Sequence, residues 1–216
     1  MNTDISVIKQ NIMTIVTVLI IAIVVISISG FNQPELIDKF KFNAYRIVHY
    51  KEYYRLFTHG FFHGGWTHLL VNMFVLWSFG DAILYYFRAS IPWNPNLLFL
   101  IFFLSSLIIS SLYSLLKEKD NPYYSAIGAS GAVSGAIFIT ILYAPWQIIY
   151  LYFIPVPGII LGAGYLIYSR VMSEKNIDNI GHDAHFWGAV YGFVFPMIFN
   201  PALITHFIRE LLSFNF

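Results

Sequence analysis

The 216-residue chain has no cysteine and few charged residues. Without cysteine it can form no disulfide, no thiolate zinc site and no thiol nucleophile. Charged residues make up 11% of the chain, whereas a soluble domain normally carries about 25%, so the chain could not cover a water-facing surface. The net charge of +1 gives no basic field for a nucleic acid. We therefore predict a membrane protein that binds no nucleic acid.

Apolar residues, by contrast, make up 58% of the chain and are gathered in long runs. A helix needs about 20 apolar residues to cross a bilayer. The runs predict an all-α fold, a polytopic membrane protein with six transmembrane helices in a single domain covering residues 1–216. The expected spans are, in chain order, about 11–30, 66–86, 97–116, 128–144, 157–172 and 184–201. The first is interpreted as a retained helix, because it is long and lacks a small-residue cleavage site.

Two connecting stretches are expected at the membrane interface. Residues 31–58 mix cations with aromatic rings, a composition suited to the interface. Residues 147–154 are apolar, but Pro155 and Pro157 cannot sit inside a regular helix, so we predict an interfacial loop there. Orientation stays open at this point. Nine of the 12 Lys and Arg fall on the side opposite the termini, which by the positive-inside rule would put both termini outside.

A glycine-rich run opens the fourth expected span, where residues 128–131 are Gly-Ala-Ser-Gly and small residues continue to Gly135. Small residues four apart let helix backbones approach closely, so a packing seam is the ordinary interpretation. The run is not the nucleophile elbow of soluble hydrolases, because Ala132 stands where that motif needs its second glycine. Ser130 is nevertheless a candidate nucleophile if a base lies beside it.

A second seam opens the last expected span, where His185, Gly188 and Gly192 share one helix face at i, i+3 and i+7. Each seam therefore carries one half of a serine–histidine pair. We predict that Ser130 Oγ and a ring nitrogen of His185 lie within hydrogen-bond reach, ~2.6–3.2 Å. His182 competes for the role of base, and His185 is preferred for its spacing to the glycines. The ordinary alternative is a histidine bonded to a carbonyl of a neighbouring helix.

Three histidines, His59, His63 and His68, precede Asn72 around the start of the second expected span. His68 and Asn72 are four apart on one helix face, and both can donate hydrogen bonds to an oxyanion. A polar seam between helices is one alternative. A zinc site is another, because His59 and His63 are also four apart. The chain has no His-Glu-x-x-His motif and few carboxylates to complete such a site, so we predict no metal and no cofactor.

Together these residues resemble the signatures of the rhomboid intramembrane serine proteases, over nearly the whole chain. The matching signatures are Tyr54-Arg55 (usually Trp-Arg), the His59/His63/His68 spacing, His68-x-x-x-Asn72, Gly128-x-Ser130-Gly131 and Ala184-His185-x-x-Gly188. Each is weak alone. In this order, at the second, fourth and sixth expected helices, they are specific.

The resemblance implies a serine endopeptidase that cleaves transmembrane proteins. Ser130 would be the nucleophile and His185 the general base and acid, in a dyad without a third acid. His68, Asn72 and the backbone N–H of Ser130 would hold the oxyanion, and Gly128 would let the chain bend beside the nucleophile. Substrates would be cut near the outer face of a bacterial cytoplasmic membrane, where their helix unravels, with both termini of the protease in the cytoplasm. We follow this topology although the charge count opposes it.

Two positions depart from the family pattern. Ser134 stands where an aromatic residue often stacks on the histidine, so another ring must orient His185. The pair His182-Asp183 is not universal, and Asp183 is a candidate for tuning the dyad. Two other functions stay open: a catalytically inactive rhomboid-like membrane chaperone, which would typically lack the serine or the histidine, and a histidine-lined metal transporter, which would not need Ser130. The sequence names neither the natural substrate nor the oligomeric state.

Overall fold

A computed structural model describes residues 13–151, 153–175 and 181–213 of the chain. These residues are mostly helical. In chain order the elements are α1 (Ile15–Asn32), α2 (Pro34–Phe40), α3 (Ala44–Tyr50), α4 (Arg55–Thr58), the 3-10 helix η2 (His59–Phe61), α5 (Trp66–Ser90), α6 (Pro95–Lys117), α7 (Ser130–Tyr143), β1 (Ile148–Leu151), β2 (Ile154–Pro157), α8 (Gly158–Lys175), α9 (His182–Phe199) and α10 (Leu203–Leu212).

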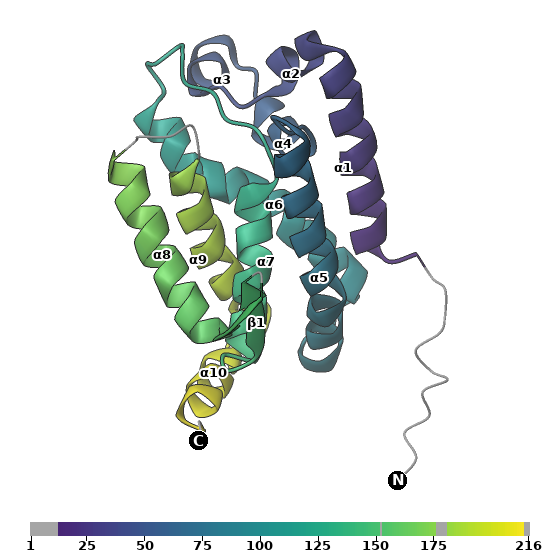
Figure 1. The fold of residues 1–216 in the computed structure, drawn as a ribbon, viewed down its shortest axis with the longest axis vertical. Coiled ribbons are helices and arrows are strands. Elements are labelled where there is room, and N and C mark those ends of the chain that lie inside the picture. The colour runs from purple at the N-terminus through teal and green to yellow at the C-terminus, as the bar shows by residue number, and fades with distance from the viewer. Residues whose placement is uncertain (1–12, 152, 176–180, 214–216) are drawn as a thin grey trace.

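The helix α7 lies in the middle of the bundle (Figure 1). It packs between α5 and α9, with α6 against both α7 and α9, while α1 packs on α5 and α8 lies at the edge beside α9. The short helices α2, α3 and α4 gather at the end of the bundle where α7 and α9 begin, and α10 lies at the other end. This arrangement brings the first turns of α7 and α9 to one end of the bundle, under the short helices.

Three described helices, α1, α5 and α6, are long and apolar enough to cross a membrane. The bent pair α9 and α10, whose axes meet at 119°, would add a fourth, and α7 is apolar but only 14 residues long. A mostly helical membrane fold agrees with the sequence prediction at this level. The finer prediction of six spans goes beyond what helix length and composition give.

The helix bounds differ from the expected spans by a few residues, for local reasons. Asn94 accepts a hydrogen bond from Leu97 N and precedes Pro95, so α6 begins two residues early. Thr14 caps α1 in the same way through Thr17 N. The first two residues of the expected first span, 11 and 12, lie outside the described residues.

The expected interfacial loop over residues 147–154 is instead largely part of a β-hairpin. Residues 148–151 form β1, which pairs antiparallel with β2 from Ile148 opposite Pro157 to Leu151 opposite Ile154. The prolines exclude a helix, as expected, but both stand in β2, where Pro155 and Pro157 need no continued helical hydrogen bond. The outcome is a two-stranded hairpin between α7 and α8.

The interface between α7 and α9 is made of glycine. A Cβ added to Gly188 would overlap the Gly131 carbonyl, and one added to Gly192 would overlap the backbone of Gly135. The two backbones are therefore in direct contact along these four glycines, which we call the glycine seam. Two side chains of α6 lie beside it, with Phe102 at the Gly135 position and Ser110 at the Gly131 position. Because the seam has no room for side chains, it fixes how α7 and α9 are aligned.

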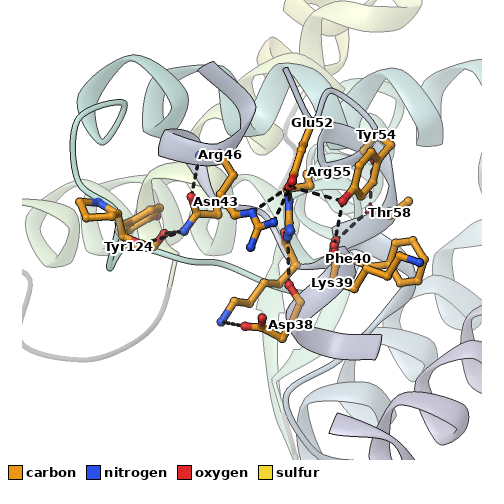
Figure 2. A network of polar contacts seen from close by, with 12 residues as sticks. Asp38, Lys39, Phe40, Asn43, Arg46, Glu52, Tyr54, Arg55, Thr58 and Tyr124 are labelled. Carbon is orange, nitrogen blue, oxygen red and sulfur yellow. Dashed lines mark hydrogen bonds and ion pairs between the residues drawn. The ribbon is translucent and has the colours of Figure 1, made fainter. Parts of the chain in front are cut away.

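A polar cluster holds the short helices together, and Figure 2 shows its contacts. The Arg55 side chain is buried, with 1% exposure, and its Nε donates to Glu52 Oε2 at 2.5 Å. Its Nη1 donates to the carbonyls of Lys41 (2.7 Å) and Asp38 (3.0 Å). Arg46 donates to both oxygens of Glu52, at 2.8 and 2.9 Å. We call Arg46, Glu52, Arg55 and these two carbonyls the Arg55 cluster.

The same segment also binds the chain that leads into α7. Asn43 Nδ2 donates to the carbonyls of Pro122 (3.0 Å) and Tyr124 (3.1 Å), and Phe42 and Ala126 exchange two backbone hydrogen bonds. The residues before Ser130 are thereby attached to the short helices. The start of α7 is therefore held by the glycine seam and, through Phe42 and Asn43, by the segment that the Arg55 cluster holds together.

Candidate active site

Ser130 and His185 face each other where α7 and α9 begin. The Nε2 atom of His185 lies 2.8 Å from Ser130 Oγ, within the range expected from the sequence. Ser130 is the first residue of α7 and His185 lies in the first turn of α9. Both are half-buried and line one cavity of about 850 Å³. The glycine seam begins one residue after Ser130 and three after His185, which explains why the two side chains meet.

A sharp turn delivers Ser130 to this position. Gly128 has φ +116°, a left-handed conformation that other residues adopt only with strain. Its backbone N–H donates to the His59 carbonyl at 2.9 Å. A Cβ at this position would come 2.5 Å from Cε1 of His68, so the imidazole of His68 packs directly on the glycine. Both the conformation and the close approach require glycine here.

Hydrogen-bond donors surround the space next to Ser130. As the first residue of α7, Ser130 has a backbone N–H without an acceptor inside its own helix, at the positive end of the helix dipole. His68 and Asn72 line the same cavity from α5. The Asn72 side chain is buried, and its Nδ2 donates to the His68 carbonyl at 2.8 Å. An amide nitrogen carries two N–H groups, so a second donor remains on Asn72.

The other two histidines of the α5 side contact different elements. His59 is buried and packs edge-on against Phe42, with ring centroids 5.8 Å apart. The Nδ1 atom of His63 lies 3.0 Å from Ser27 Oγ of α1, and its ring packs edge-on against His68. Among the residues that the structure describes, no three His, Asp or Glu side chains are grouped as metal ligands. In the structure the ring of His59 packs on Phe42, and the ring of His63 is hydrogen-bonded to Ser27.

The pair His182-Asp183 joins helices beside the dyad. His182 is buried, and its ring meets His185 edge-on at 5.9 Å and Tyr168 at 5.5 Å. Asp183 accepts hydrogen bonds from Ser173 of α8 and from Nζ of Lys117 of α6, the latter at 3.2 Å. The imidazole nitrogen that lies at Ser130 belongs to His185. Asp183 links three helices through the contacts just given.

One residue at the site was not identified from the sequence. The ring of Tyr165, on α8, stacks on His185 with centroids 6.3 Å apart and an angle of 23° between planes. Its hydroxyl lies 2.6 Å from Ser134 Oγ, and Ser134 in turn donates to the Ser130 carbonyl at 2.8 Å. The presence of Ser134 in place of an aromatic residue indicated that some other ring is needed. No sequence signal selected Tyr165 from the 15 tyrosines of the chain.

The remaining wall of the cavity is largely apolar and comes from α5, α7 and α8. Its apolar members include Val71, Val75, Val133, Ile137, Phe138 and Leu161. Polar lining groups come from the starts of α5, α7 and α9, and from Ser110, Ser111 and Ser114 of α6. The cavity can therefore hold an extended apolar segment with one end beside Ser130.

In a comparison with protein-family models, residues 50–202 match the Rhomboid domain. The match covers most of the chain and contains Ser130, His185, His68 and Asn72. The chain belongs to the rhomboid family. No curated protein matches it at a significant level. Family membership confirms the resemblance drawn from the sequence, and with the apolar helices it makes this rhomboid a polytopic integral membrane protein. The family includes serine proteases.

Proposed function

We propose that this rhomboid is an intramembrane serine endopeptidase that hydrolyses peptide bonds of transmembrane proteins. The observation that carries the proposal is the 2.8 Å approach of His185 Nε2 to Ser130 Oγ inside a cavity among apolar helices. A nucleophile and a base within hydrogen-bond reach are what covalent catalysis by serine requires. The proposal includes a single domain of six membrane spans with the site near the outer face of a bacterial cytoplasmic membrane.

The chemistry follows from the positions of the side chains. Ser130 Oγ attacks the scissile carbonyl carbon while His185 Nε2 takes the hydroxyl proton. The carbonyl oxygen becomes an oxyanion, which the Ser130 N–H, His68 and Asn72 can stabilise by hydrogen bonds. When the intermediate collapses, His185 gives the proton to the leaving amine and the acyl group stays on Ser130. A water molecule, activated by His185, then releases the second product by the same steps in reverse.

The nature of the substrate follows from the energetics of the backbone in lipid. Each unpaired backbone group in hydrocarbon costs several kcal/mol, so a membrane helix does not expose its carbonyls to a nucleophile. The substrate must unwind where polar groups and water can reach it. His68, Asn72, Ser130 and His185 provide such a polar end in the cavity. We therefore expect Gly or Pro just C-terminal to the scissile bond to increase cleavage of a poor substrate, and leucine in their place to suppress it.

Two variants test the nucleophile and the base. Ser130→Ala should abolish both cleavage of a generic transmembrane substrate and labelling by a fluorophosphonate probe in detergent. Loss of a serine nucleophile costs on the order of 10⁶ in turnover. His185→Ala should be as inactive, whereas His182→Ala, the matched control, should keep its activity. Substantial cleavage by folded Ser130→Ala would refute the proposal, and activity in His185→Ala but not in His182→Ala would show that His182 is the base.

The same preparation separates the alternative functions. An inactive membrane chaperone would leave substrate intact and Ser130 unlabelled in the wild type. A histidine-lined metal transporter would be indifferent to Ser130→Ala and sensitive to a chelator. For a protease of the proposed kind we expect EDTA to leave cleavage unchanged, so activity lost in EDTA and restored by zinc would favour the transporter.

The proposed oxyanion donors make a smaller contribution. Asn72→Ala and His68→Ala should each lower turnover by about 10²–10³, the usual cost of one such donor, without abolishing it. Their effects should be less than additive in the double variant, because both serve one oxygen. Full activity in Asn72→Ala would remove that residue from the site.

A further inference from the structure

We propose that Tyr165 and Ser134 form a positioning pair for His185, so that the dyad is competent only when α8 is seated against α7. This inference rests on the proposed function, because it concerns the orientation of the general base. Tyr165 touches neither the nucleophile nor the reacting atoms. Its ring stacks on the imidazole of His185 and so determines the orientation of the imidazole plane.

The stack determines which way the imidazole plane points. The angle of 23° and the centroid distance of 6.3 Å correspond to an offset stack. Rotation about the Cβ–Cγ bond of a histidine is broad, so the side chain alone does not hold its ring in one plane. A parallel ring on one face limits that rotation and keeps Nε2 directed at Ser130 Oγ.

Two hydrogen bonds in series then fix the tyrosine ring to the nucleophile's own helix. Because Ser134 Oγ donates to the Ser130 carbonyl, its lone pair is available to the Tyr165 hydroxyl at 2.6 Å. Tyr165 O–H therefore donates to Ser134, and Ser134 donates to the residue that carries the nucleophile. Ser134 cannot stack on His185 itself, but a small hydroxyl at its position is what receives the phenol.

Tyr165 lies on α8, whereas the dyad residues lie on α7 and α9. Ser130 and His185 belong to α7 and α9, which the glycine seam holds in backbone contact. The helix α8 buries only Gly158, Gly162 and Ser169, all of them small. A Cβ on Gly162 would come 2.8 Å from Cδ1 of Ile141 in α7. Tyr165 lies one turn beyond Gly162, so lifting α8 off Ile141 moves the ring while the seam stays closed.

A merely structural role for Tyr165 predicts different measurements. The ring also contacts Phe138, with centroids 6.2 Å apart, so its removal could loosen α8 without affecting the base. A positioning role requires that turnover falls while the substrate's KM changes little. It also requires that labelling of Ser130 by a small fluorophosphonate slows, because this probe needs the activated serine but no transmembrane segment of a substrate.

The first experiment compares ring removal with hydroxyl removal in the purified protein. Tyr165→Leu should lower kcat and the probe-labelling rate by about 10- to 100-fold, the scale of a small misplacement of a catalytic group. Tyr165→Phe keeps the ring and should recover most of both rates. Ser134→Ala should match Tyr165→Phe, and their double variant should be no worse, since both remove one hydrogen bond. The matched control is Tyr168→Leu, an exposed tyrosine of the same helix beside His182, which should be unchanged.

The second experiment tests the dependence on α8. Gly162→Val adds a Cβ and two methyl groups against both Ile141 and the ring of Phe138, so it should displace α8 and lower the labelling rate about tenfold. It should cost little more when combined with Tyr165→Leu, because coupled sites are not additive. Gly164→Val is the matched control, since nothing lies within 4 Å of a Cβ there. Full additivity of Gly162→Val and Tyr165→Leu would refute the coupling between α8 and the dyad.

The outcomes separate this inference from the function on which it rests. A folded wild type whose labelling equals that of Ser130→Ala refutes the protease itself. Wild-type labelling that depends on Ser130, with undiminished labelling of Tyr165→Leu, refutes the positioning role alone. If Tyr165→Leu does not fold, the test rests on Tyr165→Phe and Ser134→Ala. Unequal or additive effects of these two substitutions on the labelling rate would refute the hydrogen-bonded pair.

Discussion

The glycine seam and the Arg55 cluster support the same site by opposite means. In the seam, α7 and α9 touch through backbone atoms, and the side chains beside the four glycines, Ser110 and Phe102 of α6, carry no charge. In the Arg55 cluster, charged side chains bind one another and two carbonyls. The difference follows from what each region must satisfy. Membrane helices have paired backbones and gain from close packing, whereas short helices leave terminal carbonyls that need donors.

This comparison predicts that an added side chain disrupts the seam by steric overlap at any pH. The cluster should instead be disrupted by removal of a charge. Gly188→Val should have the largest effect on probe labelling of any single substitution in the two regions. Its side chain would meet the Gly131 carbonyl, which cannot move without moving α7. Overpacking costs about 1–3 kcal/mol or more, and opposing backbone atoms put this position at the upper end. We expect a much lower unfolding temperature in detergent and no probe labelling.

The control for the seam is Gly164→Val on α8, where an added side chain meets open space. Its unfolding temperature and labelling should equal those of the wild type. Normal labelling in Gly188→Val would mean that the two backbones can separate without harm to the dyad, which would break the comparison.

Arg55→Ala should be the most damaging single change in the Arg55 cluster. It removes three hydrogen bonds from a buried guanidinium and leaves the Lys41 and Asp38 carbonyls without that donor. Breaking a buried ion pair by deleting one partner costs about 3–5 kcal/mol. Thermal unfolding followed by circular dichroism should show this loss. The fraction that remains folded should still be labelled at Ser130, unlike Gly188→Val, because the seam is intact.

Glu52→Gln should have a smaller effect that depends on pH. The pKa of the Glu52 carboxyl is lowered from 4.5 to about 2, chiefly because Arg46 donates to it, with Arg55 adding to the effect. A lowered folded-state pKa stabilises the fold fully above about pH 4.5, and the stabilisation is lost as the pH falls towards 2. The difference in unfolding temperature between wild type and Glu52→Gln should therefore be largest near pH 7 and shrink on acidification to pH 3. A difference that stayed constant over this range would contradict an ionic role.

The smallest effect is expected at an exposed ion pair. Arg170 and Glu174 on α8 lie 2.8 Å apart, but their side chains are 53% and 63% exposed. Exposed pairs contribute about 0–1 kcal/mol at most. Glu174→Gln should leave both the unfolding temperature and the labelling rate unchanged. A loss comparable to that of Glu52→Gln would show that burial is not what distinguishes the Arg55 cluster.

The parts of the site that could be predicted from sequence are those encoded by local spacing. Ser130 and His185 each stand at a fixed helical interval from glycines of the seam, so the facing positions followed from two short motifs. Tyr165 could not be found in this way. Its contact with His185 depends on how α8 is rotated and shifted against α7, and that packing is set by Gly162 meeting Ile141 rather than by any motif around the tyrosine.

The same distinction explains the differences in the fold. Asn94 with Pro95, and Gly128 with its left-handed backbone, act locally, so the six helices that the sequence predicts begin within four residues of their expected starts. The β1–β2 hairpin depends on pairing between Ile148 and Pro157, nine positions apart, which apolar composition does not reveal. Likewise the sequence placed Asn72 on the face of His68 but could not show that its amide bonds to the His68 carbonyl.

Because α7 is short, the depth of the site in a membrane would depend on the thickness of the bilayer. Fourteen residues at about 1.5 Å each make a rod of roughly 21 Å, whereas the hydrocarbon layer is about 30 Å thick. Beyond the opposite end of α7, Trp146 donates to the Leu211 carbonyl of α10. Tryptophan is enriched at the lipid–water boundary of membrane proteins. If that end lies at the boundary and α7 stands perpendicular to the membrane, the first turn of α7 would lie roughly 9 Å below the far surface. In that arrangement the depth of Ser130 below the surface depends on the length of the lipid chains, and longer chains would lengthen the path of water to the proposed active site.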